Sequence, residues 1–444
     1  MRVTLNLNAM HGRSGHHLPG YGCCGTANAS EVGFPPWNCT QSEALLRWTV
    51  AHIPEQQWPA WLGLGNEKTG LIPTPQYVAD LATLRAMLDR VFPKGTAPQT
   101  YAPCGCSKDL ASPGLNSVGF LEAVAAAEAA AGTPLLGAFS WHSYPQLCKQ
   151  SSPAVEAADL RGGTGVLMTQ RYYNNMAATL QAHPPGRALS WITESAYSCG
   201  GPANASKGGA AAAVDGMLRA VDMPWYIDAL GAASASGVHV FCKETLVGDW
   251  LETIRSWQGA SGAMDYGPHA DFWVAALWAK LMGQKVLAVT VKPQQQSDLP
   301  LAPRPGRDAE VIMPAPSVVL RAYAHCGRTS GSVVIAMTNV GNSSAPLVVS
   351  LSAVSLSDIA EAAPSSSAAA ATQWVLSGAS AAADGALLNG KPLAVTVTDE
   401  RVSIPSLEGS EVVGGSVSLP LGAVAFVEIQ TTAPACAHDE RRSS

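Results

Sequence analysis

The feature that most constrains the fold is a regular alternation of short β-prone runs with longer helical stretches, from residue 1 to about residue 283. The helical stretches carry apolar residues at a spacing near 3.6, and the short runs are apolar segments that end in polar residues. Six such runs occur: RVTLNLNAM, WPAWLGLGNE, APQTYAPCG, LLGAFSWHSYP, RALSWITES and GVHVFCKETL. This alternation predicts an α/β fold with a parallel sheet and helical crossovers. The length of the units predicts a (β/α)8-type TIM barrel, although only six of its eight strands are found.

The character of the chain changes after residue 284. Strand-like segments then follow one another without long helices, separated by turns rich in Gly, Pro, Ser and Asn. We therefore expect an incomplete (β/α) barrel over residues 1–284, a β-sandwich domain over residues 285–436 and a disordered tail over residues 437–444.

Composition argues against several classes of function. Charged residues make up 14% of the chain and the formal net charge is −6, so there is no general basic surface for nucleic acid. No uninterrupted apolar run reaches the roughly 18 residues of a membrane-spanning helix. We therefore expect a soluble protein without nucleic-acid partners. Peripheral membrane association and the oligomeric state stay open.

The cysteines and glycosylation triplets concern the cellular compartment. Ten cysteines and four N-x-Ser/Thr triplets indicate an oxidising compartment, which predicts a secreted, lysosomal or vacuolar protein. The N-terminus, MRVTLNLNAMHGR, nevertheless lacks the apolar segment and cleavage site of a signal peptide. The segment GHHLPGYGCC lacks the paired Cys-x-x-Cys spacing of structural zinc, so we predict no metal site there. Cys104 and Cys106 in PCGC carry no further information at this stage.

Two predicted strands end in a glutamate. Glu67 follows WLGLGN and Glu194 follows WIT, and Glu244 in FCKETL is the one comparable residue. A single glutamate at a strand end is most often a solvated surface residue. In a β/α barrel, however, the working residues lie at the carboxyl ends of the strands, around one rim. Two carboxylates across such a rim suit glycoside hydrolysis, in which one is protonated to assist the leaving oxygen and the other is ionised.

Six motifs follow one another in order along the chain: GLGNE, WHSYP, WITESAYSCGG, DFWVAALWAKLMGQKVL, LLNGKPL and LPLGAVAFVEIQTTAPAC. As an ordered set they resemble heparanase and the plant heparanase-like β-glucuronidases of glycoside hydrolase family 79. The resemblance implies a retaining glycosidase that cleaves β-linked glucuronic acid in extracellular or cell-wall glycans. A two-carboxylate mechanism of this kind requires no metal and no organic cofactor.

The resemblance implies a role for each residue that matches a motif. Glu67 matches the acid/base on the fourth barrel strand, and Glu194 matches the nucleophile on the seventh. Asn66 would hydrogen-bond the sugar 2-hydroxyl. Tyr144, on the sixth strand, would hydrogen-bond the nucleophile and keep it ionised. His142 lies on the same strand among the substrate-binding candidates, and a buried structural histidine is the alternative interpretation.

The chain also departs from the family pattern. RVTLNLNAM resembles the third barrel strand, so the first two βα units and a signal peptide would be absent, which we interpret as an N-terminal truncation. Glu244, a further substrate-binding candidate, stands where the family usually has Gln; it would repel a uronic acid unless it pairs with Lys243 or another lysine, and Asp249 is another awkward neighbour for an anion. The loop that receives the glucuronate carboxylate is represented only by VGDWL, in which Gly248 and Trp250 are the substrate-binding candidates. The basic clusters that hold heparan sulfate have no counterpart.

The resemblance also implies a disulfide between Cys326 and Cys436 in the sandwich. Such a bond would contribute about 4 to 5 kcal/mol on the chain-entropy estimate, and two unpaired buried thiols are the alternative. Two alternatives to the glucuronidase stay open at this stage. The chain could be a non-catalytic glycan-binding homologue, or a retaining β-glycosidase for neutral sugars.

Overall fold

The computed structural model describes most of the chain, with gaps. The described residues are 4–9, 35–67, 72–105, 117–144, 164–182, 188–197, 211–247, 252–258, 264–291, 320–341, 345–351, 354–356, 371–378, 386–398, 401–430 and 436. The predicted tail at 437–444 lies outside them. The chain divides into two compact units. Unit 1 contains residues 1–147, 172–195 and 236–243, and unit 2 contains residues 148–171, 196–235 and 244–444. The boundaries expected from the sequence, 1–284 and 285–436, stay a prediction.

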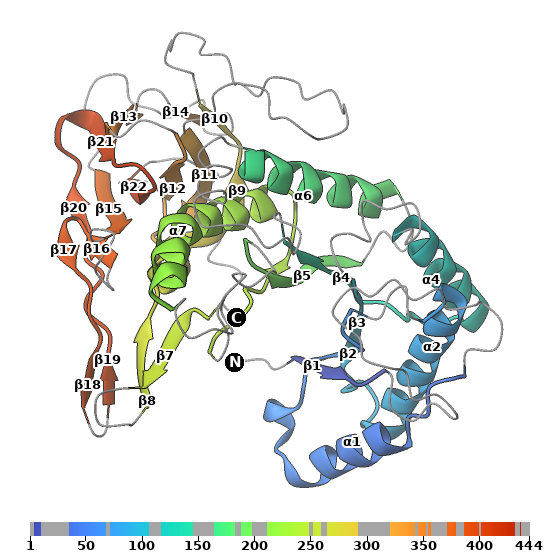
Figure 1. The fold of residues 1–444 in the computed structure, drawn as a ribbon. Coiled ribbons are helices and arrows are strands. Elements are labelled where there is room, and N and C mark those ends of the chain that lie inside the picture. The colour runs from blue at the N-terminus through green and yellow to red at the C-terminus, as the bar shows by residue number, and fades with distance from the viewer. Residues whose placement is uncertain are drawn as a thin grey trace. The chain divides into compact units, whose positions relative to one another are not determined.

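Unit 1 is built on a six-stranded sheet in which every neighbouring pair is parallel (Figure 1). The strand order equals the chain order, and the predicted α/β fold with a parallel sheet is therefore confirmed. The strands are β1 (Thr4–Leu7), β2 (Trp61–Leu64), β3 (Gln99–Gly105), β4 (Ala138–Ser143), β5 (Leu189–Ser195) and β6 (Val240–Phe241).

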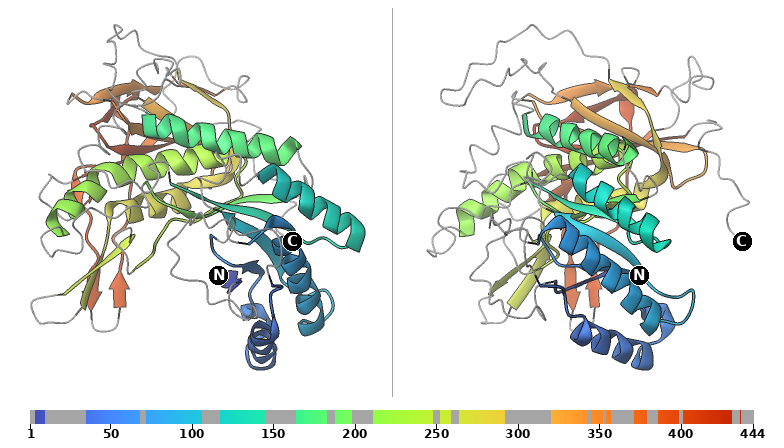
Figure 2. Two further views of the ribbon diagram at one scale, coloured as in Figure 1. Left: turned by 45° about the vertical axis from the view of Figure 1, so that its right-hand side comes forward. Right: turned by 90° about the vertical axis from the view of Figure 1, so that its right-hand side faces the viewer.

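Helices connect these strands, as the alternating pattern requires. They are α1 (Thr40–His52), the short 3-10 helix η1 (Glu55–Gln57), α2 (Thr74–Val91), α4 (Ser117–Ala131) and α6 (Thr164–Ala182). Helix α2 shows why they form: its buried residues recur every three or four positions, from Tyr77 through Leu81 and Leu84 to Leu88. Helices α1, α2 and α4 lie along one side of the sheet (Figures 1 and 2). Phe120 of α4 packs between Tyr77 and Phe139 of β4, with both ring centroids 6.1 Å away.

An aromatic layer fills the other side of the sheet. The ring of Trp191 lies 4.4 Å from that of Trp61 and 5.5 Å from that of Tyr101. Glycine is needed where the backbone passes close to these rings. A Cβ added at Gly63 would lie 2.6 Å from the Tyr101 ring, and one added at Gly137 would lie 2.8 Å from the Trp61 ring. The layer therefore fixes the spacing of the strands that carry it.

Unit 2 combines two long helices with antiparallel sheets. The helices are α7 (Ala211–Ala235) and α8 (Ala270–Leu281). The largest sheet has the order β17-β16-β15-β22-β12-β11-β9, with β20 paired to β15. Its strands are β9 (Met282–Leu287), β11 (Leu320–Gly327), β12 (Ser332–Asn339), β15 (Ala371–Gly378), β16 (Ala386–Leu388), β17 (Lys391–Pro392), β20 (Ser410–Glu411) and β22 (Val424–Gln430).

Four two-stranded antiparallel sheets complete the described part of unit 2. They pair β7 (Ile254–Gln258) with β8 (Met264–Pro268), β10 (Val289–Val291) with β14 (Val354–Leu356), β13 (Leu347–Ser350) with β21 (Ser416–Leu419), and β18 (Thr396–Thr398) with β19 (Arg401–Ser403). A short 3-10 helix, η5 (Val413–Gly415), precedes β21. One hydrophobic cluster joins the main sheet to β13 and β21, with Val333, Val349 and Val417 among its buried residues.

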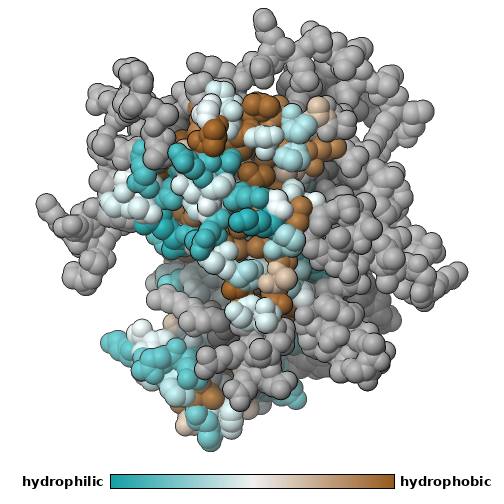
Figure 3. All heavy atoms as spheres, turned by 90° about the vertical axis from the view of Figure 1, so that its left-hand side faces the viewer, coloured by the Kyte–Doolittle hydropathy of each residue, from teal (hydrophilic) through white to brown (hydrophobic). Residues whose placement is uncertain are grey.

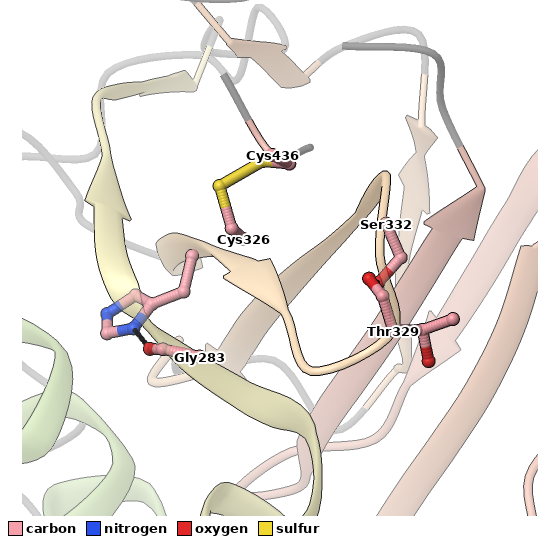
Figure 4. Close-up of a disulfide and its surroundings, with 6 residues drawn as sticks. Gly283, Cys326, Thr329, Ser332 and Cys436 are labelled. Carbon is pink, nitrogen blue, oxygen red and sulfur yellow. Dashed lines mark hydrogen bonds between the residues drawn. A yellow bond between two sulfur atoms is a disulfide. The ribbon is translucent and has the colours of Figure 1, made fainter. Parts of the chain in front are cut away.

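A disulfide joins Cys326 in β11 to Cys436, with a Cα–Cα distance of 5.1 Å (Figure 4). The predicted pairing is therefore present, and it closes a loop with a sequence separation of 110 residues. Strand β9 passes close beside this bond, because a Cβ added at Gly283 would lie 2.4 Å from the carbonyl oxygen of Cys326. His325 donates a 2.7 Å hydrogen bond from Nδ1 to the carbonyl of Gly283. The disulfide thus ties the last described residue of the chain to the main sheet.

A buried ionic cluster holds α7 against β11. Asp228 is fully buried and accepts hydrogen bonds from Arg321 Nε at 2.6 Å and from Tyr323 Oη at 2.7 Å. The helix lies close to the strand here, since a Cβ added at Gly231 would lie 2.0 Å from the Tyr323 ring. Burial raises the pKa of Asp228, and the arginine and tyrosine partly oppose that shift.

The surface mixes polar and apolar residues. On the face drawn in Figure 3, hydrophilic residues cover much of the described surface and hydrophobic residues form patches among them. Within the described ranges, no helix is both long and apolar enough to cross a membrane.

Candidate active site

Four of the predicted site residues come together at one edge of the unit 1 sheet. Glu67 follows β2, His142 lies in β4, Tyr144 directly follows β4, and Glu194 lies in β5. The strands are parallel, so their carboxyl ends share an edge, as the prediction from strand ends requires. His142 is paired in register with Glu194. Glu67 and His142 are buried, with 4% and 1% of their surfaces exposed.

His142 links the two carboxylates. Its Nδ1 lies 2.9 Å from Glu67 Oε1 and 3.5 Å from Glu194 Oε2. One carboxylate oxygen of each glutamate and the imidazole nitrogen all lie within 4.8 Å of one another. Tyr144 donates a short hydrogen bond from Oη to Glu194 Oε1. Retaining glycosidases hold their carboxyl groups about 5 to 5.5 Å apart, whereas inverting enzymes hold them about 6.5 to 9.5 Å apart. One oxygen of Glu67 and one of Glu194 lie within 4.8 Å of each other, below the inverting range.

The backbone is strained where Glu67 enters the site. Glu67 and Cys104 both have φ of +52°, in the left-handed region that non-glycine residues rarely adopt. Such a conformation costs about 1 to 3 kcal/mol and is found most often at functional sites. The two residues support each other, because the Glu67 N–H donates to the Cys104 carbonyl at 3.0 Å. Nearby, Asn6 Nδ2 donates to the carbonyl of Gly65 at 3.0 Å. The turn after β2 is thus anchored to two other strands.

The electrostatics of the site centre on His142. Burial lowers the pKa of this imidazole, but the neighbouring Cys104, the hydrogen bond with Glu67 and the charge of Glu194 raise it by more, and the net pKa is about 10. At neutral pH the ring is therefore an imidazolium beside the two carboxylates. His142 contacts both glutamates directly and is also buried, so its substrate-binding role and the alternative of a buried structural histidine both stay predictions.

The same three donor atoms are close enough to surround a metal ion. A metal, however, requires a neutral imidazole and must compete with the bound proton. Because the pKa of His142 is raised to about 10, a metal would have to displace that proton at neutral pH.

Cys104 is the site residue that sequence reasoning missed. It is 1% exposed, its carbonyl accepts the Glu67 N–H at 3.0 Å, and its sulfur lies 3.2 Å from Ser140 Oγ. One signal in the sequence could have found it: PCG lies at the end of a predicted strand in the same parallel sheet as Glu67 and Glu194.

The other predicted site residues are not brought into this cluster. Asn66 is exposed beside Glu67. Glu244 is partly buried and belongs to unit 2, whereas the cluster belongs to unit 1. Gly248 and Trp250 lie outside the described residues.

The chain was compared with models of known protein families and with curated proteins. No model of a known protein family matches the chain. Heparanase-like protein 1 of Arabidopsis thaliana is 26% identical over 355 residues, which cover 77% of this chain and 51% of that protein. Baicalin-β-D-glucuronidase of Scutellaria baicalensis is 23% identical over 182 residues, which cover 39% of this chain and 27% of that protein. The chain spans about half the length of the heparanase-like relatives it matches.

A solved structure shares the fold. It is a 4-O-α-L-rhamnosyl-β-D-glucuronidase from Fusarium oxysporum, 14% identical, with a TM-score of 0.51 over 88% of this chain and 74% of that one. At this identity the likeness concerns the fold alone. The sequence similarity makes the chain a relative of the heparanase-like proteins, built on the α/β fold of a glycoside hydrolase.

Proposed function

We propose that this protein is a retaining glycoside hydrolase that cleaves β-linked glucuronic acid in an extracellular or cell-wall glycan. The observation that carries the proposal is the carboxylate pair: oxygens of Glu67 and Glu194 lie within 4.8 Å, with His142 between them and Tyr144 on Glu194. The glucuronide specificity is supported by sequence similarity to a protein named as a β-D-glucuronidase.

The mechanism assigns one role to each carboxylate. Glu194, oriented by the Tyr144 hydroxyl, attacks the anomeric carbon as the nucleophile while Glu67 donates a proton to the leaving oxygen. A covalent glycosyl-enzyme forms and the aglycone departs. Glu67 then acts as base and takes a proton from water, which attacks the same carbon and releases the sugar with its β configuration retained.

His142 supports both steps through charge. The imidazolium lies 2.9 Å from Glu67, so it stabilises the carboxylate that remains after Glu67 has donated its proton. It also lies 3.5 Å from Oε2 of Glu194, the proposed nucleophile. Asn66, next to Glu67, is proposed to hydrogen-bond the sugar 2-hydroxyl.

Two further features belong to this proposal. The antiparallel sheets of unit 2 are proposed to form the C-terminal β-sandwich that accompanies the barrel. Secretion, or a lysosomal or vacuolar location, is supported by the disulfide between Cys326 and Cys436, since such bonds persist in oxidising compartments.

The test compares hydrolysis of para-nitrophenyl β-glucuronide by the full chain with that by Glu194→Gln and Glu67→Gln. Each substitution is expected to reduce kcat by at least about a thousandfold, because it removes a group that reacts in the transition state. The matched control is Glu55→Gln, an exposed glutamate in η1, which is expected to keep full activity. Proton NMR of the first sugar released should show the β anomer.

Three outcomes would overturn parts of the proposal. Full activity in Glu194→Gln would remove the nucleophile assignment. Faster hydrolysis of the β-glucoside than of the β-glucuronide would make the enzyme a glycosidase for neutral sugars. Glycan binding without any product would make the chain a non-catalytic homologue.

A further inference from the structure

The pairing of β4 with β5 is irregular just before Glu194. The register shifts at Thr193, which is the extra residue of a β-bulge in β5. After the shift His142 is opposite Glu194, and the pairing ends one position later, at Ser143 and Ser195. A bulge disrupts the backbone ladder locally and is found most often at sheet edges and beside active sites. Bonds made by side chains therefore gain importance at this end of β5.

Ser195, the residue after Glu194, makes such a bond. It is fully buried, and its hydroxyl donates a 2.8 Å hydrogen bond to the carbonyl oxygen of Ser143. That carbonyl belongs to the peptide group that joins Ser143 to Tyr144. The bond therefore ties the end of β5 to the backbone that carries Tyr144.

This bond completes a ring of contacts around the proposed nucleophile. Tyr144 Oη donates to Glu194 Oε1, and Ser195 Oγ donates to the Ser143 carbonyl. One peptide link joins Glu194 to Ser195, and another joins Ser143 to Tyr144, so the two hydrogen bonds close a circuit. In such a network each bond restrains the groups that form the other. The Tyr144 hydroxyl is thus held at the carboxylate from the backbone side as well.

Helix α6 anchors the same ring from outside. The Ser143 hydroxyl donates to Tyr173 Oη of α6 at 3.3 Å, and both residues are buried. The Tyr173 ring in turn packs edge-on against Trp141 of β4, with the ring centroids 5.3 Å apart. Ser143 is therefore a fixed point, and the bond from Ser195 transmits that position to the end of β5.

We propose that Ser195 is a positioning residue for Glu194: its hydroxyl holds the peptide before Tyr144, so that the Tyr144 hydroxyl stays on the Glu194 carboxylate. The inference deepens the assignment of this site and rests on the proposed function for its kinetic consequences. Without the Ser195 hydroxyl, the Ser143 carbonyl loses a donor and Tyr144 loses its restraint from β5. The effect on catalysis passes through Tyr144, which makes it separable from a general loss of stability.

The experiment uses the full chain with Ser195→Ala, Tyr144→Phe and the two substitutions combined. The matched control is Ser332→Ala in β12. Ser332 is also fully buried and also donates a 2.8 Å hydrogen bond to a backbone carbonyl, that of Thr329 (Figure 4). It belongs to unit 2, whereas Glu194 belongs to unit 1. A further variant, Ser195→Cys, keeps the size of the side chain but has a weaker donor.

The kinetic expectation is a loss that depends on the Tyr144 hydroxyl. On para-nitrophenyl β-glucuronide, kcat should fall about fivefold in Ser195→Ala with KM nearly unchanged, and by less in Ser195→Cys. In the Tyr144→Phe background, Ser195→Ala should reduce kcat less than about twofold, because the hydrogen bond that it positions is already gone. Ser332→Ala should lower the urea midpoint about as much as Ser195→Ala but leave kcat unchanged.

A second measurement does not depend on activity. In protein labelled with tyrosine that carries ¹³C at ring carbon Cζ, the NMR signal of Tyr144 is assigned by its loss in Tyr144→Phe. The Cζ chemical shift depends on the hydrogen bond of the adjacent hydroxyl. The Tyr144 signal should therefore move in Ser195→Ala and keep its position in Ser332→Ala.

The two measurements separate this inference from the proposed function. An unmoved Tyr144 signal in Ser195→Ala would overturn the positioning role, even in an active glucuronidase. Equal losses of kcat with and without the Tyr144 hydroxyl would also overturn it. A moved signal in a chain without glycosidase activity would support the ring of contacts and refute only the function. If Ser195→Ala does not fold, Ser195→Cys decides by the same signal: a displacement supports the inference, and an unmoved signal overturns it.

Discussion

The raised pKa of His142 predicts a specific dependence of stability on pH. The ordinary pKa of 6.5, which applies to the unfolded chain, rises to about 10 in the folded protein. A group whose folded pKa is raised binds its proton more tightly when folded. Its contribution to the free energy of unfolding is therefore complete below about pH 6.5 and is lost as pH rises towards 10. At 1.36 kcal/mol per unit, the shift corresponds to a contribution on the order of 5 kcal/mol.

The perturbation that tests this contribution is His142→Gln, which keeps a polar side chain without a titratable proton. The free energy of unfolding would be measured by urea denaturation from about pH 6 to about pH 10, followed by tryptophan fluorescence. The wild-type advantage should be largest near pH 6 and should shrink by about 1.4 kcal/mol per pH unit. The control is His52→Gln, an exposed histidine of α1. A difference between wild type and His142→Gln that stays constant or grows with pH would refute the reasoning.

Three further substitutions have expected magnitudes. Tyr144→Phe removes the hydrogen bond to the proposed nucleophile, and kcat on a β-glucuronide should fall about 10- to 100-fold with little change in KM. Asp228→Asn leaves a buried arginine without its counter-ion, so it should lower the free energy of unfolding, measured by urea denaturation, by about 3 to 5 kcal/mol. The control is Asp89→Asn, which removes an exposed carboxylate from its ion pair and should lower the same free energy by less than about 1 kcal/mol. Gly63→Ala places a methyl group 2.6 Å from the Tyr101 ring and should destabilise by about 1 to 3 kcal/mol; an unchanged urea midpoint would contradict this packing.

The parallel sheet and the carboxylate pair could be predicted from the sequence for one physical reason. Side-chain periodicity identifies strands and helices. Because helices connect strands that run parallel, the carboxyl ends of all these strands lie at the same edge of the sheet. Glu67 and Glu194 lie at strand ends, so this rule was enough to predict that they lie at the same edge of the sheet. The disulfide between Cys326 and Cys436, in contrast, required the family resemblance, because cysteine spacing does not determine pairing.

Cys104 shows what periodicity cannot predict. A bulge changes which face a side chain points to, and the signal for it is a local register shift between two strands rather than a pattern along one of them. Helix α7 is a second example. The alternation of strands and helices places it within the predicted barrel, yet Asp228 and Ser234 of this helix bond Arg321 and His325 of β11. Such partners are distant in sequence, so no local window contains them.

The distance between the two glutamates also constrains the shape of the sheet. Glu67 and Glu194 belong to β2 and β5, which are separated by β3 and β4. In a flat sheet three strand spacings amount to about 14 Å. Oxygens within 4.8 Å across that interval require the sheet to curve so that β2 and β5 face each other, as strands do in a barrel wall. The contact of Trp61 in β2 with Trp191 in β5, at 4.4 Å, requires the same curvature on the same side of the sheet. The aromatic layer therefore acts on the carboxylate pair through the curvature of the sheet: Trp61 and Trp191 help set the separation of the two proposed catalytic glutamates.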